Sequence, residues 1–245
     1  MKNHTMEWAD SYIALDLETT GLDPKRDKII EIGACFVENG EIQRELSFLI
    51  NPHRMLSERI ISLTGLTDEI LREAPDIETV LGEIMDFLGE LPLLGHHIIF
   101  DYSFLKRAAV SAGYPFERTG IDTLSLCRLF MPEEEKKNLA AACAWFQTPQ
   151  EKAHRALSDA RSAHFLYQAI KKRHFMEHEM AFRGKPLIYK VKKDQPASKK
   201  QKQDLQELTK YHKICLAVDV EYLTRSEASR LTDKIISKYG RMKKR

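Results

Sequence analysis

Three short apolar segments near the start of the chain have the pattern of β-strands. Residues 12–17 (YIALDL) are mostly apolar, and the segment TTGLDP after them is rich in residues that break strands. Residues 29–37 and 42–50 are two further apolar segments, and the Asn39–Gly40 pair between them favours a hairpin turn. The pattern therefore predicts three consecutive strands.

The next hundred residues alternate between helical and strand patterns. Behind Pro75 and a capping Asp76, apolar residues recur at helical spacing as far as Leu88. We expect short strands at 93–95 and 120–123, and helices at 102–112, 124–130, 139–146 and 156–171. Three strands followed by alternating helices and strands predict an α/β fold, in which helices pack on a mixed five-stranded sheet.

The composition changes after Arg173. Residues 176–197 are polar and contain Gly and Pro, which is typical of a linker, so we expect the first domain to span residues 1–175. Residues 198–245 hold two separate helical patterns, at 198–212 and 224–239, and Thr224 and Glu227 form a capping box at the start of the second. These patterns predict a small basic helical module of unknown role.

The net charge of +2 conceals an asymmetry along the chain. From Met176 to Arg245 there are 18 Lys and Arg but 9 Asp and Glu, a net charge of +9, so the preceding residues carry −7. An acidic body with a basic tail indicates an anionic partner for the tail. The alternative is that the Lys-rich helices are only solvated surface.

The overall composition is that of an ordinary folded protein, with 43% hydrophobic and 30% charged residues among 245. No apolar run is long enough to span a bilayer, and the first residues lack the apolar core of a signal peptide. The four scattered cysteines include no CxxC pair, which favours reduced thiols. We therefore expect a cytoplasmic protein that does not contact membranes.

Two carboxylates stand out in the first predicted strand. Asp16 and Glu18 are two residues apart, so both side chains leave the same face of the strand. Burying unpaired charges costs several kcal/mol or forces protonation. Either the pair lies at an exposed strand end beside Lys or Arg, or it has a chemical role.

Three segments together favour the chemical role. They are Asp16–Gly21 (DLETTG), His96–Leu105 (HHIIFDYSFL) and His154–Arg161 (HRALSDAR). In this order and separation they resemble the motifs of the DnaQ-like exonucleases, in the DEDDh branch that has a catalytic histidine. The resemblance covers roughly residues 10–173 and includes Lys28–Ala34 (KIIEIGA). One departure is His97, where the family usually has Asn.

The resemblance implies a ribonuclease H-like fold and a metal-dependent 3′→5′ exonuclease that releases 5′-mononucleotides. It implies four carboxylate ligands for two Mg²⁺ ions, with Mn²⁺ as a substitute: Asp16, Glu18, Asp101 and Asp159. Oxygen ligands suit such hard cations, and two ions can clamp both sides of a phosphodiester. The resemblance also implies that His154 is the general base, since a histidine pKa near ~6.5 allows proton uptake at neutral pH.

Five further residues fall where members of the family contact the terminal nucleotide: Thr19, Leu22, Leu63, Thr64 and Phe100. Thr19 would offer its backbone or hydroxyl, and Leu22 would wedge against the base. Ordinary core packing is an equally good explanation for Phe100. We expect Asp122 to be a structural acid that caps or hydrogen-bonds, and not a fifth ligand.

The expected binding partner is the single-stranded 3′ end of a nucleic acid, with DNA favoured over RNA. A DNA polymerase or another replication or repair protein is a further candidate partner. Two alternatives remain open: an exoribonuclease, and an inactive nucleic-acid-binding or scaffold protein on the same fold. The second alternative conflicts with the presence of all five chemical residues.

Overall fold

The computed structural model describes residues 10–150, 154–191 and 193–242. Its centre is a mixed sheet built from β1 (Tyr12–Thr19), β2 (Ile29–Glu38), β3 (Glu41–Leu49), β4 (Leu93–Gly95), β5 (Thr119–Asp122) and β6 (Lys185–Pro186). The strand order is β3-β2-β1-β4-β5-β6. The β1–β4 and β4–β5 pairs are parallel, and the other pairs are antiparallel. The predicted mixed α/β sheet is confirmed.

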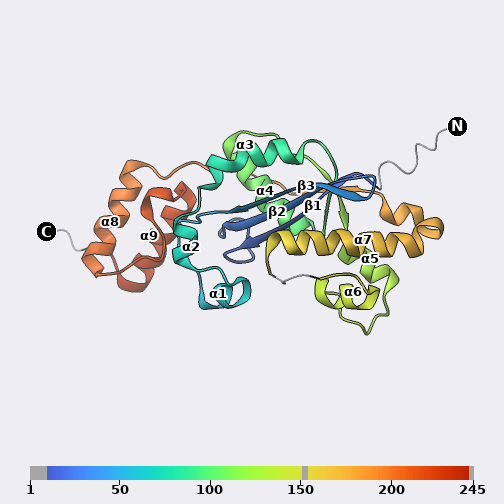
Figure 1. Ribbon diagram of the computed structural model, residues 1–245. Coiled ribbons are helices and arrows are strands. Elements are labelled where there is room, and N and C mark those ends of the chain that lie inside the picture. The colour runs from blue at the N-terminus through green and yellow to red at the C-terminus, as the bar shows by residue number, and fades with distance from the viewer. Residues whose placement is uncertain (1–9, 151–153, 192, 243–245) are drawn as a thin grey trace.

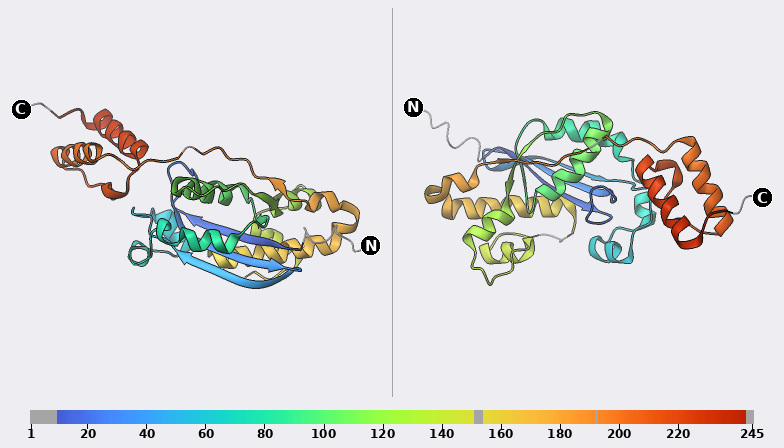
Figure 2. Two further views of the ribbon diagram at one scale, coloured as in Figure 1. Left: turned by 90° about the horizontal axis from the view of Figure 1, so that it is seen from above. Right: turned by 180° about the vertical axis from the view of Figure 1, so that it is seen from behind.

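Helices cover both faces of the sheet (Figures 1 and 2). One face packs against α3 (Ile77–Leu88) and α4 (Ile99–Ala112), and the other against α5 (Thr123–Phe130), α6 (Leu139–Phe146) and α7 (Ala156–His178). β1 is buried on both faces because Tyr12 and Ala14 enter one core while Ile13 and Leu15 enter the other. Two short helices, α1 (Glu58–Thr64) and α2 (Asp68–Arg72), follow β3.

The sheet has six strands, whereas the sequence predicted five. The additional strand, β6, has only two residues and pairs with β5 inside the segment predicted to be a linker. α7 also extends to His178, seven residues beyond its predicted end, and leads into a 3-10 turn, η2 (Glu179–Phe182). Phe182 is fully buried against Tyr167 and Phe175. A Gly-Lys-Pro stretch looks like a linker in sequence, but its pairing with β5 joins it to the sheet.

The C-terminal helices α8 (Lys199–His212) and α9 (Arg225–Tyr239) flank a 3-10 turn, η3 (Val220–Tyr222). They enclose a core of their own, and Gln201 bonds Arg225 and Ser229 while His212 bonds Gly240, so the two helices run in the same direction. The predicted capping box of Thr224 and Glu227 is confirmed. The division of the chain into domain, linker and module stays a prediction.

The C-terminal helices contact the body beside the end of β3. Met55 donates its backbone N–H to the Ala217 carbonyl, and Asp219 donates to the His53 carbonyl. Arg54 pairs with Glu227 at 3.0 Å. These contacts place α9 beyond the end of the sheet where β1 terminates (Figure 1). Among the residues that the structure describes, none of the helices has the length and apolar character needed to cross a membrane.

Candidate active site

The candidate active site begins with two carboxylates of β1. Asp16 and Glu18 lie on the same face, and their partners across the antiparallel pair are Gly33 and Glu31 of β2. Gly33 has a specific spatial role, because a Cβ atom there would lie 2.0 Å from the backbone nitrogen of Leu157. The missing side chain lets the start of α7 approach the sheet closely. That approach brings the residues of α7 to the β1 carboxylates.

Asp101 joins the site from the first turn of α4. Its side chain is only 3% exposed, and its Oδ1 accepts a 3.0 Å hydrogen bond from the backbone N–H of Leu17. Leu17 stands between Asp16 and Glu18, so this bond ties the start of α4 to the middle of the β1 motif. The second sequence motif, which contains Asp101, therefore folds back onto β1.

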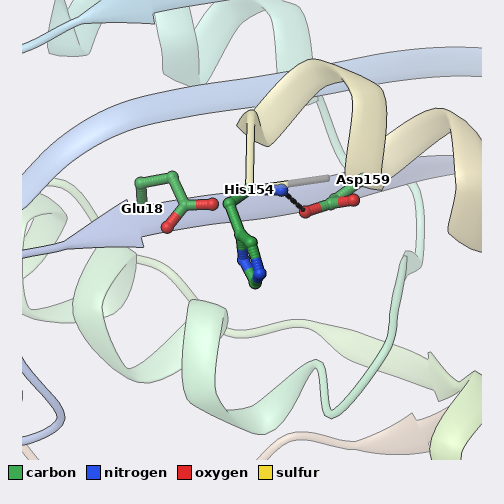
Figure 3. Close-up of side chains that lie close together, drawn as sticks. All are labelled: Glu18, His154 and Asp159. Atoms are coloured by element: carbon green, nitrogen blue, oxygen red, sulfur yellow. Dashed lines mark hydrogen bonds between the residues drawn. The ribbon is translucent and has the colours of Figure 1, made fainter. Parts of the chain in front are cut away.

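His154 and Asp159 come from the start of α7. The backbone N–H of His154 donates to Asp159 Oδ2 at 2.9 Å, with His154 in the left-handed region at φ 62°. Ligand atoms of Glu18, His154 and Asp159 all lie within 4.8 Å of one another. Figure 3 shows the imidazole of His154 extending from the loop between the two carboxylates.

The carboxylates raise one another's pKa values. Burial, followed by the charges of Asp101, Asp159 and Glu18, raises the pKa of Asp16 well above its ordinary value. Burial and the charge of Asp159 raise the pKa of Glu18 from 4.5 to about 7. Burial also raises the pKa of Asp101 and of Asp159.

These four carboxylates need added positive charge nearby if all of them are to ionise together at neutral pH. The donors are carboxylate oxygens with one imidazole nitrogen nearby, which suits hard divalent cations such as Mg²⁺ or Mn²⁺. The side chains therefore fit the metal ions that the sequence led us to expect.

One ion pair that the sequence does not predict stabilises the site. Glu31 is 1% exposed and accepts hydrogen bonds from Arg155 Nε at 3.0 Å and Arg155 Nη2 at 2.9 Å. Its other oxygen accepts from the backbone N–H of Ala156. Glu31 therefore holds the two residues after His154 against β2. The KIIEIGA segment contained this glutamate, but its partner is 124 residues away.

The comparisons with known proteins identify the family. The family model described as Exonuclease (RNase_T) matches residues 13–167, which contain all five residues of the candidate site. The chain belongs to this exonuclease family. It is 36% identical over 166 residues to the DNA polymerase III PolC-type of Bacillus subtilis, covering 66% of this chain and 12% of that protein. The corresponding protein of Clostridium perfringens is 33% identical over 181 residues, covering 74% of this chain and 12% of the relative.

Solved exonuclease structures are similar to this chain in fold. Exonuclease X in complex with 5′ overhanging duplex DNA is 26% identical, with a TM-score of 0.54, and the match covers 69% of this chain and 97% of that one. Exonuclease I of E. coli in complex with a dT13 oligonucleotide has a TM-score of 0.62 at 16% identity, over 70% of this chain and 43% of that one. The ribonuclease H-like exonuclease fold is thus confirmed. The curated relatives are much longer, since the matched segments are only 11–12% of their length.

The residues expected to contact the terminal nucleotide have varied surroundings. Leu22 is 80% exposed in the loop after β1, and Leu63 is exposed on α1. The hydroxyl of Thr19 donates to the Gly21 carbonyl. Thr64 is buried, and its hydroxyl donates to the Ile60 carbonyl. Phe100 is half-buried and packs on Phe104.

Asp122 has the structural role that we expected. Its carboxylate accepts from the backbone N–H groups of His97 and Leu124 and from the hydroxyl of Ser125. His97 has φ 75°, a left-handed conformation that Asn and His tolerate better than most residues. The departure from the family's Asn therefore preserves the turn that leads into α4.

Proposed function

We propose that this exonuclease hydrolyses DNA from its 3′ end and releases 5′-mononucleotides. The observation that supports this most directly is the cluster of Glu18, His154 and Asp159, whose ligand atoms lie within 4.8 Å of one another. The charges of Glu18, Asp101 and Asp159 also act on Asp16, which extends the cluster to the four carboxylates. The relatives include polymerases named for DNA, and one similar structure is named as a complex with overhanging DNA. The direction and the DNA substrate are parts of this proposal.

The proposed chemistry divides the site between binding and proton transfer. Asp16, Glu18, Asp101 and Asp159 would hold two Mg²⁺ ions. When bound, the ions supply positive charge that lets the carboxylates ionise together and offsets charge on the phosphodiester. His154 accepts a proton from the water whose oxygen attacks phosphorus, while the bond from phosphorus to the 3′ oxygen of the preceding nucleotide breaks. The hydrogen bond to Asp159 fixes the backbone of His154 for this task.

Digestion of end-labelled oligonucleotides tests this proposal. With Mg²⁺, the wild-type protein should shorten a 5′-labelled single strand stepwise from its 3′ end, and EDTA should stop the reaction. D16N should be inactive, whereas the matched control D86N, at an exposed position of α3, should match the wild type. Near wild-type digestion by D16N, or equal degradation of a circular single strand, would refute the proposal.

The same assay decides between the alternatives. Matched DNA and RNA oligomers distinguish an exodeoxyribonuclease from an exoribonuclease, and we expect the DNA strand to be digested faster. An inactive scaffold would digest neither strand in Mg²⁺ or Mn²⁺.

We also propose that a DNA polymerase or a repair protein is a partner, because the relatives carry the matched segment within a polymerase. Titrating a purified replicative polymerase against this protein by light scattering would detect the complex. A cytoplasmic location stays a prediction.

A further inference from the structure

A row of basic side chains lies along one face of α9. Arg230, Lys234 and Lys238 are spaced four residues apart, which places them on the same side of the helix at intervals of about 6 Å. All three are exposed. Within the described residues, no carboxylate forms an ion pair with any of them. We call these three residues the α9 basic row.

An acidic residue near this face is already neutralised. Glu227, one turn before Arg230, is buried and pairs with Arg54 at 3.0 Å and with Lys28 at 3.5 Å. The negative charge of Glu227 is therefore neutralised by Arg54 and Lys28. Asp233 falls on the neighbouring face of the helix, about 60° from Arg230 at 100° per residue. The row itself remains positive.

The near end of the row meets the loop beside the candidate active site. Arg230 Nη2 donates to the Lys25 carbonyl at 3.5 Å, and Arg54 Nη1 donates to the Arg26 carbonyl at 2.6 Å. Lys25 and Arg26 are exposed in the loop that leaves β1 just after Glu18 and Thr19, and Arg26 pairs with Asp23 of the same loop at 3.3 Å. Lys25 thus extends the positive charge of α9 to this loop, and α9 continues away from the sheet (Figure 1).

We propose that the α9 basic row, with Lys25, binds the phosphate backbone of a single DNA strand whose 3′ end lies in the candidate active site. This inference rests on the proposed function and adds to it a surface that holds the strand between successive cuts. Residues 1–175 carry a net charge of −7, so this part of the protein as a whole repels DNA. Contacts from Lys and Arg to phosphates carry no sequence information, so binding should not depend on sequence.

Two triple variants with the same change in charge test the surface. One is R230Q/K234Q/K238Q, and the control is K199Q/K200Q/K210Q, which removes three exposed charges from α8. Affinity for a long oligothymidylate is measured by fluorescence anisotropy in EDTA, over a series of salt concentrations, so that no cleavage takes place. Circular dichroism should show unchanged folding, because all six side chains are exposed.

The expected difference follows from counterion release. Each lost phosphate contact lowers the log–log salt slope by about 0.7 on single strands, so the α9 variant should lose about 2. Between ~50 and ~200 mM salt, a fourfold change, the advantage of the wild type over the α9 variant should shrink roughly twenty-fold. The α8 control should keep the wild-type slope.

Three results would overturn the inference: wild-type affinity in the α9 variant, equal losses in both variants, or a loss in the α8 control alone. Digestion of a trithymidylate by the wild-type protein in Mg²⁺ is measured separately. If the trithymidylate is cut and the α9 variant binds normally, the inference fails while the proposed function survives. If nothing is cut but binding depends on the α9 basic row, the proposed function fails while the binding surface is supported.

Discussion

Replacing Glu18 by Gln should stabilise the metal-free protein. In the folded chain burial and Asp159 raise the pKa of Glu18 from 4.5 to about 7. A group whose pKa is raised by folding contributes stability below its unfolded pKa and loses that contribution as the pH rises through its folded pKa. The loss therefore runs from pH 4.5 to about 7 and is complete above 7.

The size of the effect follows from the same values. The difference between 4.5 and about 7, at about 1.4 kcal/mol per pH unit, corresponds to about 3 kcal/mol. Gln has the shape of Glu without its charge, so E18Q should recover about 1–3 kcal/mol at pH 8, allowing for relaxation of the neighbouring groups. The gain should shrink toward zero as the pH falls to 4.5.

Urea unfolding in EDTA at pH 8 and pH 4.5 measures this gain. The matched control is E31Q, which removes the same charge from the residue opposite Glu18 on β2. Glu31 is bound by Arg155, so E31Q should lower the free energy of unfolding by about 1–3 kcal/mol. Adding Mg²⁺ should raise the stability of the wild type more than that of E18Q. An E18Q protein less stable than the wild type at pH 8 in EDTA would refute the reasoning about the site's charge.

Three other predictions concern single residues. H154A should lower kcat by about 10²–10⁴-fold with a much smaller change in KM, and an unchanged pH–rate profile would show that the histidine is structural. G33A should destabilise the fold by about 1–3 kcal/mol or more, because a Cβ atom would lie 2.0 Å from the backbone of Leu157. The control G82A lies inside a helix with its nearest neighbour at 3.5 Å, so it should be neutral or stabilising. Thermal melting measures both variants. Burial lowers the pKa of His164 from 6.5 to about 4, so the unfolded chain takes up a proton at this residue before the folded chain does. The free energy of unfolding should therefore fall by up to ~3 kcal/mol as the pH is lowered from 6.5 to 4. Urea unfolding over a pH series should show a smaller fall in H164Q.

The sequence predicted the strands and helices of the sheet because local patterns specify them. Asp16 and Glu18 share a face through strand geometry alone, and Asn39–Gly40 form the expected hairpin between β2 and β3. The motif resemblance then led to Asp101 and Asp159, which the fold brings to the same place. These features depend on residues close in sequence or on a known family pattern.

The missed features depend on distant partners. β6 consists of Lys185 and Pro186, which have no strand pattern of their own and are held by pairing with β5. The Glu31–Arg155 pair is invisible without the fold, because neither residue indicates its partner. The four-residue spacing of the α9 basic row can be read from the sequence. The contact of Arg230 with Lys25, which is 205 residues away, cannot be read from the sequence.

Glu227 makes the start of α9 and the docking of the C-terminal helices one cooperative event. Burial opposes its ionisation, but Lys28, the groups of Thr224 and Arg54 hold its pKa below the ordinary value. The same carboxylate closes the capping box of α9 and meets two cations of the body. Undocking exposes the carboxylate to water and removes both cations, while fraying of the first turn moves the carboxylate away from them. The amide protons of that turn should therefore exchange with solvent only as fast as the whole C-terminal segment detaches.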